Sequence, residues 1–188
     1  MMRSLLAVLF GLFLATSGHV AAGHAADLAK PAGPVVLTVH GNIASTNRGG
    51  VNDFDDAFFK FGDVKFDRAA AFDRAMLEKL GMKKLAVKYD TWPARYSFEG
   101  PLLADVLKAA GAKGKSIRVF AIDGYGAEIP MTDLEKYPVL LALKANGRWL
   151  GLGDRGPTWV VYPREDFAEL KQQDDAKWVW SAIRIEVQ

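Results

Sequence analysis

The 188-residue chain contains no cysteine. This absence excludes disulfide bonds, thiolate metal ligands, iron–sulfur clusters and a cysteine nucleophile. Histidine is scarce as well: of three histidines, His19 and His24 lie in a segment that reads as a leader, which leaves His40 in the rest of the chain. His40 follows an expected strand, and we expect it to be a satisfied histidine at the surface or rim. With one histidine left, a metal site built from several histidines is strongly disfavoured, and a Ser-His-Asp triad would have to use His40.

The chain also lacks an excess of charge of one sign. It has 24 Lys and Arg against 22 Asp and Glu, so its formal net charge is only +2. This balance gives no electrostatic reason to expect nucleic acid or an anionic membrane as a partner. Half of the residues are apolar, which excludes a disordered chain and predicts one globular domain of ordinary size.

No hydrophobic run reaches transmembrane length. The apolar stretch at residues 5–14 follows Arg3 and is followed by small residues, with cleavage positions after Ala22 and Ala25. We expect a signal peptide over residues 1–25 and a mature chain that enters the periplasm without membrane insertion. An uncleaved N-terminal anchor is the alternative.

The remaining chain predicts an N-terminal arm over residues 26–34 and a single domain over residues 35–188. Phe54, Phe58 and Phe61 have helical spacing. A second helix is expected to begin at Asp67 and to carry Phe72, Met76 and Leu80 on one face. A third is expected from Pro101 to Gly111, with a buried stripe at residues 102, 103, 106, 107 and 110.

Strands are expected at residues 35–39, 85–89, 117–122, 139–143, 159–162 and 183–187. Asn146-Gly147 predicts a tight hairpin between residues 139–143 and 149–150. Helices early and strands late favour an α+β fold over a doubly wound parallel sheet.

Several motifs, in their order and spacing, resemble one family. They are Phe72-Asp73-Arg74-Ala75-Met76-Leu77, Thr91-Trp92, the stretch from Tyr96 to Leu107 with Gly100-Pro101, Ala121-Ile122-Asp123-Gly124-Tyr125, Ile129-Pro130, Asn146-Gly147-Arg148, the stretch from Arg155 to Pro163, and Lys177-Trp178-Val179-Trp180. Together they resemble the short exported branch of the sulfite-oxidase-type (oxidoreductase) molybdopterin-binding domain over residues 35 to 188.

This resemblance implies a single-domain mixed α+β fold with three to four short helices and a β-rich core around a pterin site. In the enzymes of the family, a cysteine just before the stretch equivalent to Asp90-Thr91-Trp92 binds molybdenum. That position falls near Lys88 here, and an ammonium group is a poor metal ligand. Some short exported members resemble periplasmic pterin-binding proteins that relay the state of the pterin to a membrane-bound cyclic-di-GMP signalling protein.

The candidate site residues combine flat rings, a carboxylate and a guanidinium, because a pterin is planar and polar around its rim. They are Trp92, Asp123, Tyr125, Arg155, Gly156 and Trp159. Each has a structural alternative. The rings are also compatible with core packing, and Arg155 and Gly156 are also compatible with an ordinary loop or turn. Asp123 is compatible with an Asx turn onto the backbone of Tyr125. No catalytic residue and no metal ligand is predicted.

Three functions remain open from the sequence. The first is an exported protein that binds a pterin without molybdenum catalysis and contacts the periplasmic domain of a membrane signalling protein. The second is a molybdopterin-dependent oxidoreductase whose protein metal ligand is atypical or absent. The third is an interaction domain that kept the fold and lost the pocket. The absence of cysteine favours a non-enzymatic role.

Overall fold

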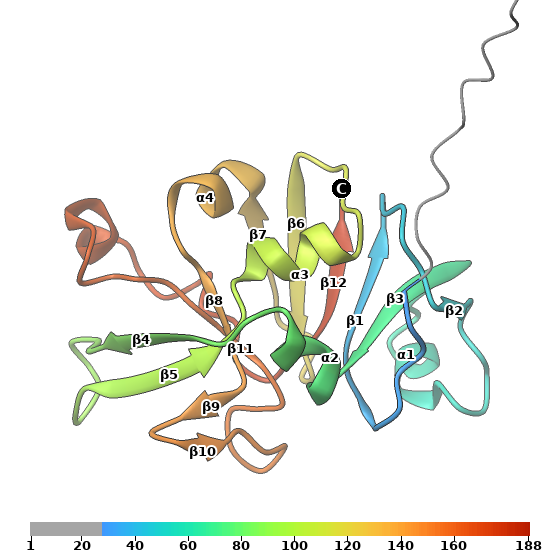
Figure 1. The fold of residues 1–188 in the computed structure, drawn as a ribbon, viewed down its shortest axis with the longest axis horizontal. Helices are drawn as coiled ribbons and strands as arrows, with labels where there is room; N and C mark the ends of the chain where they lie inside the picture. Colours follow the sequence, from blue (N-terminus) through green and yellow to red (C-terminus); the bar gives the residue numbers. More distant parts are fainter. Residues whose placement is uncertain (1–27) are drawn as a thin grey trace, which may run out of the picture.

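Strands dominate the part of the chain that the computed structural model describes, residues 28–188 (Figure 1). The predicted signal peptide, residues 1–25, lies outside the described residues. The largest sheet has six strands in the order β2 (Arg48–Gly49), β3 (Arg68–Asp73), β1 (Val35–Gly41), β12 (Ala182–Val187), β6 (Ser116–Ala121) and β7 (Gly126–Pro130). The β1–β12 pair is parallel, and the other pairs are antiparallel.

Two smaller sheets form the other half of the molecule (Figure 1). One contains β10 (Arg148–Trp149), β9 (Lys144–Ala145), β5 (Tyr96–Gly100) and β4 (Lys83–Val87), in that order. The other pairs β11 (Trp159–Val161) with β8 (Leu140–Ala142). Contacts between β5 and β8 join the two, so residues far apart in the sequence meet there.

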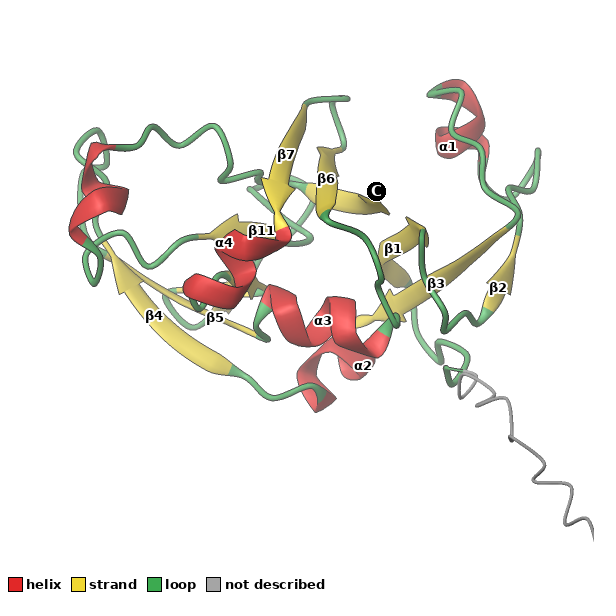
Figure 2. Cartoon of the chain, turned by 90° about the horizontal axis from the view of Figure 1, so that it is seen from above, coloured by secondary structure: helices red, strands yellow, loops and turns green. Residues whose placement is uncertain are grey.

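The helices are short: α1 (Ala57–Phe61), α2 (Arg74–Lys79), α3 (Leu103–Ala109), α4 (Met131–Lys136) and the 3-10 turn η1 (Ala168–Gln172). Figure 2 shows α2, α3 and α4 on one side of the six-stranded sheet and α1 on the other. Helix α3 buries Leu103, Val106 and Leu107, as the sequence predicts. No helix within residues 28–188 is long and apolar enough to cross a membrane. The architecture confirms the α+β prediction.

The predicted helix beginning at Asp67 is wrong in its first half. Residues 68–73 form β3, and α2 begins only at Arg74. Ala69, Ala70 and Ala71 are buried, and β3 lies between β1 and β2. Pairing on both edges in a buried sheet outweighs the helix propensity of alanine, because propensity is worth only tenths of a kcal/mol per residue.

Asp73, not Asp67, caps helix α2. Its buried carboxylate accepts hydrogen bonds from the backbone N–H of Met76, Ala32 and Gly33, each at 2.8 Å. These bonds lower the pKa of Asp73, the bonds from Gly33 and Met76 contributing most. The same carboxylate therefore caps helix α2 and fixes the N-terminal arm through its hydrogen bonds to Ala32 and Gly33.

We predict that Asp73→Ala lowers the free energy of unfolding by about 2 kcal/mol, because it leaves three N–H groups without their acceptor. Urea denaturation followed by circular dichroism measures this loss. Asp67→Ala is the matched control and should change stability by less than about 0.5 kcal/mol. Equal effects of the two substitutions would contradict the assignment of the cap.

His40 is buried, at 4% exposure, and is not at the surface or rim as expected from the sequence. Its Nε2 lies 2.9 Å from Nη1 of Arg184, and its ring stacks on Phe66 with centroids 5.1 Å apart. Burial, followed by the nearby positive charge of Arg184, lowers the pKa of His40 from 6.5 to about 4, whereas Glu186 opposes this shift. The imidazole is therefore a neutral acceptor for the guanidinium.

Because the native pKa of His40 is depressed, the unfolded state binds more protons than the native state between pH 6.5 and about 4. The stability that the neutral imidazole contributes is complete above pH 6.5 and is lost as the pH falls toward 4. We predict that the free energy of unfolding falls less steeply across this window in His40→Gln than in the wild type. Parallel curves in denaturation series at pH 4 to 7 would refute this.

Candidate functional site

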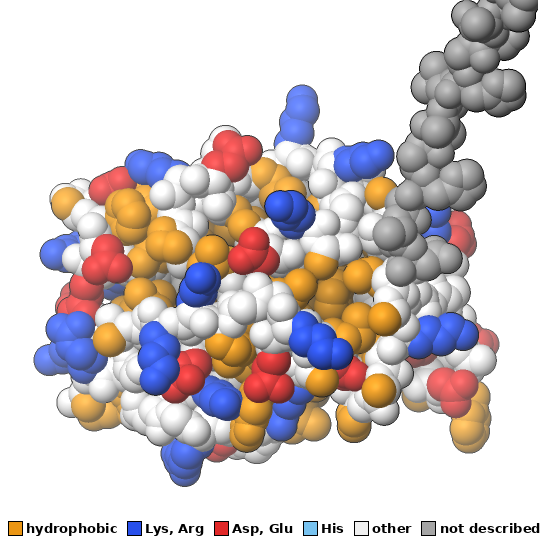
Figure 3. Space-filling model, in the orientation of Figure 1, with side chains coloured by type: hydrophobic (Ala, Val, Ile, Leu, Met, Phe, Trp, Pro, Cys, Tyr) orange, Lys and Arg blue, Asp and Glu red, His pale blue; other side chains and the backbone are white. Residues whose placement is uncertain are grey.

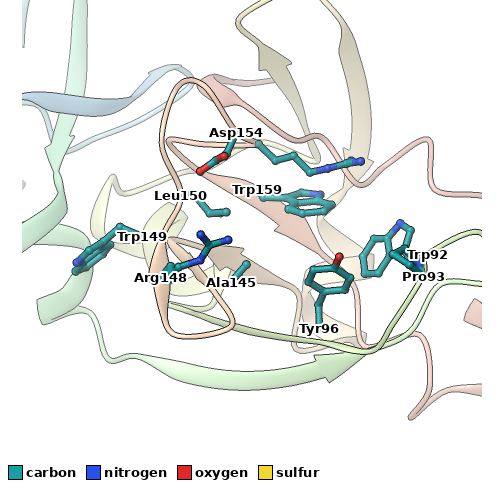
Figure 4. A pocket seen from close by; sticks show the side chains of 10 residues that line it. Trp92, Pro93, Tyr96, Ala145, Arg148, Trp149, Leu150, Asp154 and Trp159 are labelled. Carbon is teal, nitrogen blue, oxygen red and sulfur yellow. The ribbon is translucent and has the colours of Figure 1, made fainter.

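A cavity of about 370 Å³ opens where the two smaller sheets and the loop over residues 150–157 meet (Figure 4). We call it the tryptophan cavity. Its lining residues are aromatic, apolar and charged: Trp92, Pro93, Tyr96, Ala145, Arg148, Trp149, Leu150, Asp154, Arg155 and Trp159. In Figure 4, Trp159 lies at the centre, Trp92 and Tyr96 lie on one side of it, and Trp149 stands apart at the outer end.

The aromatic walls pack against one another and into the core. The ring centroid of Trp92 lies 5.5 Å from that of Trp159 and 5.6 Å from that of Tyr96. Trp159 also meets Phe98 edge to face at 5.0 Å, and its Nε1 donates to the backbone oxygen of Trp178 at 3.1 Å. The walls are thus fixed before any ligand binds, which lowers the entropic cost of binding a flat ring.

The hairpin between β9 and β10 delivers Arg148 to the cavity. Asn146 and Gly147 have positive φ values of 49° and 75°, which the predicted Asn-Gly turn requires. The side-chain oxygen of Asn146 accepts from the backbone N–H of Ser97 at 2.9 Å, and the backbone N–H of Asn146 donates to the backbone oxygen of Ser97 at 2.7 Å. The turn is therefore bonded to the start of β5, beside Tyr96.

The loop over residues 150–157 supplies Asp154 and Arg155. Gly156 donates to the oxygen of Gly151 at 3.0 Å, and Arg155 accepts at its backbone oxygen from the N–H of Ser181 at 2.8 Å. The guanidinium carbon of Arg155 lies 4.9 Å from the ring centroid of Trp159 and 5.6 Å from that of Trp180. Stacking on two rings orients the Arg155 cation toward the cavities.

A second cavity of about 270 Å³, which we call the adjacent cavity, shares Trp92, Arg155 and Trp159 with the first. Asp123 and Tyr125 line it, together with residues 175, 176 and 178–180. The Tyr125 hydroxyl donates to the oxygen of Ala176 at 2.7 Å, which connects the turn after β6 to this segment. The two cavities are neighbouring compartments separated by tryptophan rings.

The structure brings five of the six predicted site residues to these cavities: Trp92, Asp123, Tyr125, Arg155 and Trp159. Asp123 forms the Asx turn that the sequence left open, accepting from the N–H of Tyr125 at 3.0 Å, and its role toward a ligand stays a prediction. Gly156 lines neither cavity. It is buried, and a Cβ there would lie 2.5 Å from the backbone carbon of Leu150, so glycine sets the path of the loop.

Sequence reasoning missed the aromatic and charged lining side chains Tyr96, Arg148, Trp149 and Asp154, as well as the apolar Pro93, Ala145 and Leu150. Arg148 follows the Asn-Gly turn, which the sequence predicted between strands at residues 139–143 and 149–150. The strands that flank the turn are instead β9 and β10, whereas β8 pairs with β11. The signal therefore gave the turn but neither the strand pairing nor the direction of the Arg148 side chain. Asp154 and Arg155 share one Gly-rich loop, but only Arg155 was selected. Charges of both signs are interspersed over the face seen in Figure 3, so no broad charged patch points to these residues.

The fold is an α+β domain whose cavity has aromatic walls and a rim of charged side chains. Over residues 37–181, the sequence matches the family described as oxidoreductase molybdopterin binding domain. The chain belongs to this family and is a molybdopterin-binding domain of the oxidoreductase type. A search of curated proteins finds no significant match.

The residues of the tryptophan cavity fit the pterin part of such a cofactor. Rings at Trp92, Tyr96 and Trp159 match a planar system, and Arg148, Arg155 and Asp154 offer donors and an acceptor to its rim. When bound, the pterin supplies the planar redox-active ring. The side chains present act by stacking, donating and accepting hydrogen bonds and excluding water.

The donor set does not fit a protein bond to molybdenum. The sequence has no thiol, and residues 28–188 contain no group of three or more His, Asp or Glu side chains placed to hold a metal. Lys88, near which the resemblance implies the metal ligand, is exposed and lines neither cavity.

Proposed function

We propose that this protein binds a pterin in the tryptophan cavity and acts as a binding protein without molybdenum catalysis. One observation carries the proposal: aromatic walls and a mixed Arg and Asp rim surround a cavity that offers no thiolate, and residues 28–188 hold no cluster of three or more His, Asp or Glu side chains placed for a metal. The second candidate, a molybdopterin-dependent oxidoreductase without a protein ligand, keeps the same cavity and differs in its metal content.

In this proposal the ring lies against Trp159, beside Trp92 and Tyr96. Arg148 and Arg155 donate to oxygen and nitrogen acceptors of the rim, and a carboxylate accepts two adjacent N–H groups of the pyrimidine edge. Asp154 lines the same cavity as both arginines, whereas Asp123 lies in the adjacent cavity and already accepts from the backbone. Asp154 is therefore the better placed of the two acceptors.

We predict that Asp154→Asn weakens pterin binding by about 2 kcal/mol, or roughly 30-fold. The side-chain NH2 group of asparagine would face an N–H group of the pyrimidine edge, so one hydrogen bond would be replaced by two opposed donors. Asp123→Asn is the paired variant and should change the affinity less than threefold. Fluorescence titration with a reduced and an oxidised pterin measures both. A larger loss of affinity for Asp123→Asn than for Asp154→Asn would instead show that Asp123, in the adjacent cavity, accepts the N–H groups of the pyrimidine edge, as the sequence predicts.

Export and a signalling partner complete the proposal. The pattern of residues 1–25 supports export to the periplasm, and the resemblance to exported pterin-binding proteins supports docking onto the periplasmic domain of a membrane-bound cyclic-di-GMP signalling protein. Fractionation of cells expressing the full chain tests the first part. Recovery in the cytoplasm at full length would contradict it.

Ligand analysis separates the two candidate functions. The purified protein is denatured, and the supernatant is assayed for pterin fluorescence and, by mass spectrometry, for molybdenum. Pterin without molybdenum is the expected result. Stoichiometric molybdenum would favour the oxidoreductase, and the absence of both, with no binding of added pterins, would show that the pocket has lost its ligand.

A further inference from the structure

An exposed apolar groove is lined by residues of β1, of α1 and of the loop over residues 150–157, together with Arg74 at the start of α2. In Figure 2, α1 lies on the opposite side of the six-stranded sheet from α2 and α3. The groove has a volume of about 380 Å³. Val35, Phe58, Ile122 and Leu152 line it and are 47%, 51%, 37% and 68% exposed. Soluble monomers rarely leave large apolar side chains gathered in one concave patch, and such patches usually mark a binding surface.

Arg74 brings an unpaired positive charge to this groove. Its Nη2 donates to the oxygen of Leu150 at 3.0 Å, and its Nε is buried without a hydrogen-bond partner. Its guanidinium carbon lies 5.0 Å from the ring centroid of Trp149. Within residues 28–188 no carboxylate forms an ion pair with Arg74, in contrast to Arg48, which pairs with Asp56 on the other side of the groove.

We propose that this groove docks a segment of a partner protein that carries apolar side chains and one carboxylate for Arg74. The charge pattern favours this occupant over an anionic membrane, because two arginines and two aspartates line the groove and their charges cancel, so the groove as a whole does not attract an anionic surface. A single carboxylate needs only one cation, and among the residues that the structure describes Arg74 is free of an ion pair, whereas Arg48 is paired with Asp56. Asp55 precedes α1, whereas Arg74 bonds to the loop that begins at Leu150. We therefore expect the carboxylate of the docked segment to lie beside Arg74, at the end of the groove next to the loop over residues 150–157, and away from Asp55.

The groove and the tryptophan cavity share the loop over residues 150–157. Leu150, Asp154 and Arg155 line the cavity, and Leu152 and Pro157 line the groove. Resting on the proposed function, we infer that the docked segment and the pterin influence each other through this loop. Coupling between two ligands is reciprocal, so a bound pterin changes the affinity for the segment by the same factor as the segment changes the affinity for the pterin.

A peptide selection tests the docking surface directly. A random peptide library displayed on phage is selected on the immobilised purified protein, and enriched peptides are synthesised and titrated by fluorescence anisotropy. We expect an apolar pair next to Asp or Glu, with affinity reduced at least tenfold by Arg74→Gln and by Leu152→Asp. Arg74→Lys should retain part of the affinity. Phe54→Asp is the matched control, because Phe54 is 89% exposed and does not line the groove.

Three results would overturn the docking proposal. One is selected peptides whose affinity is unchanged by both Arg74→Gln and Leu152→Asp. The second is a dimer in sedimentation experiments that Leu152→Asp dissociates, since the groove would then hold a second copy. The third is binding to phosphatidylglycerol vesicles that Leu152→Asp abolishes. Circular dichroism confirms folding of each variant.

The coupling is tested by titrating the same peptide with and without a saturating pterin. An equal affinity would refute the coupling alone. If no pterin binds at all, the proposed function fails, whereas peptide binding to the ligand-free protein still tests the groove. The two failures are therefore distinguishable.

Discussion

Replacement of Trp159 by alanine is expected to lower the free energy of unfolding by about 3–5 kcal/mol and to abolish pterin binding. Trp159 is only 6% exposed and packs against Trp92 and Phe98. Its loss also leaves the backbone oxygen of Trp178 without its donor. Because the ring forms a wall of both cavities, the substitution would merge them and remove the stacking surface.

Urea denaturation measures the stability, and fluorescence titration with a pterin measures the binding. Trp159→Phe separates the two effects, since it restores most of the packing and should recover more stability than affinity. Phe54→Ala is the matched control, because Phe54 is 89% exposed and lines neither cavity. A Trp159→Ala protein with wild-type affinity would exclude the tryptophan cavity as the pterin site.

Gly156→Val is expected to cost about 3 kcal/mol of stability and to reduce pterin affinity at least 100-fold. A Cβ at Gly156 would lie 2.6 Å from the oxygen of Leu150 and 2.8 Å from the nitrogen of Gly151. These are backbone atoms, which cannot rotate away as a flexible side chain does. The loop would have to move and would carry Asp154 and Arg155 out of position.

Gly153→Val is the control for this prediction within the same loop, because a Cβ at Gly153 has no heavy atom within 4 Å. We expect this variant to keep both its stability and its affinity. Thermal unfolding compares the stability of the two variants, and titration with a pterin compares their affinities. Equal affinities would mean that the loop over residues 150–157 does not position the ligand.

The helical spacing of Phe54, Phe58 and Phe61 illustrates the limit of periodicity. A helix does form in this region, as α1, but Phe54 and Phe61 are 89% and 94% exposed. An apolar stripe predicts that a helix has a face to bury, not that a neighbour is present to cover it. Only the arrangement of the sheet beneath α1 reveals an open groove at this place.

The sequence by itself determined the chemistry that is available. Lack of cysteine excludes a protein thiolate on a metal whatever the fold, and the Asn-Gly turn, the stripe of α3 and the β-branched segments are local signals that need no partner. The α+β class followed from these signals.

The tertiary structure alone decided which side chains meet. Arg148, Asp154 and Trp159 come from a hairpin, a loop and a strand that different sheets hold, so no local pattern places them around one cavity. The same holds for the alanines of β3, which became a strand because two neighbouring strands pair with it. Contacts between distant segments outweigh local preferences of a few tenths of a kcal/mol, and those contacts are absent from any window of the sequence.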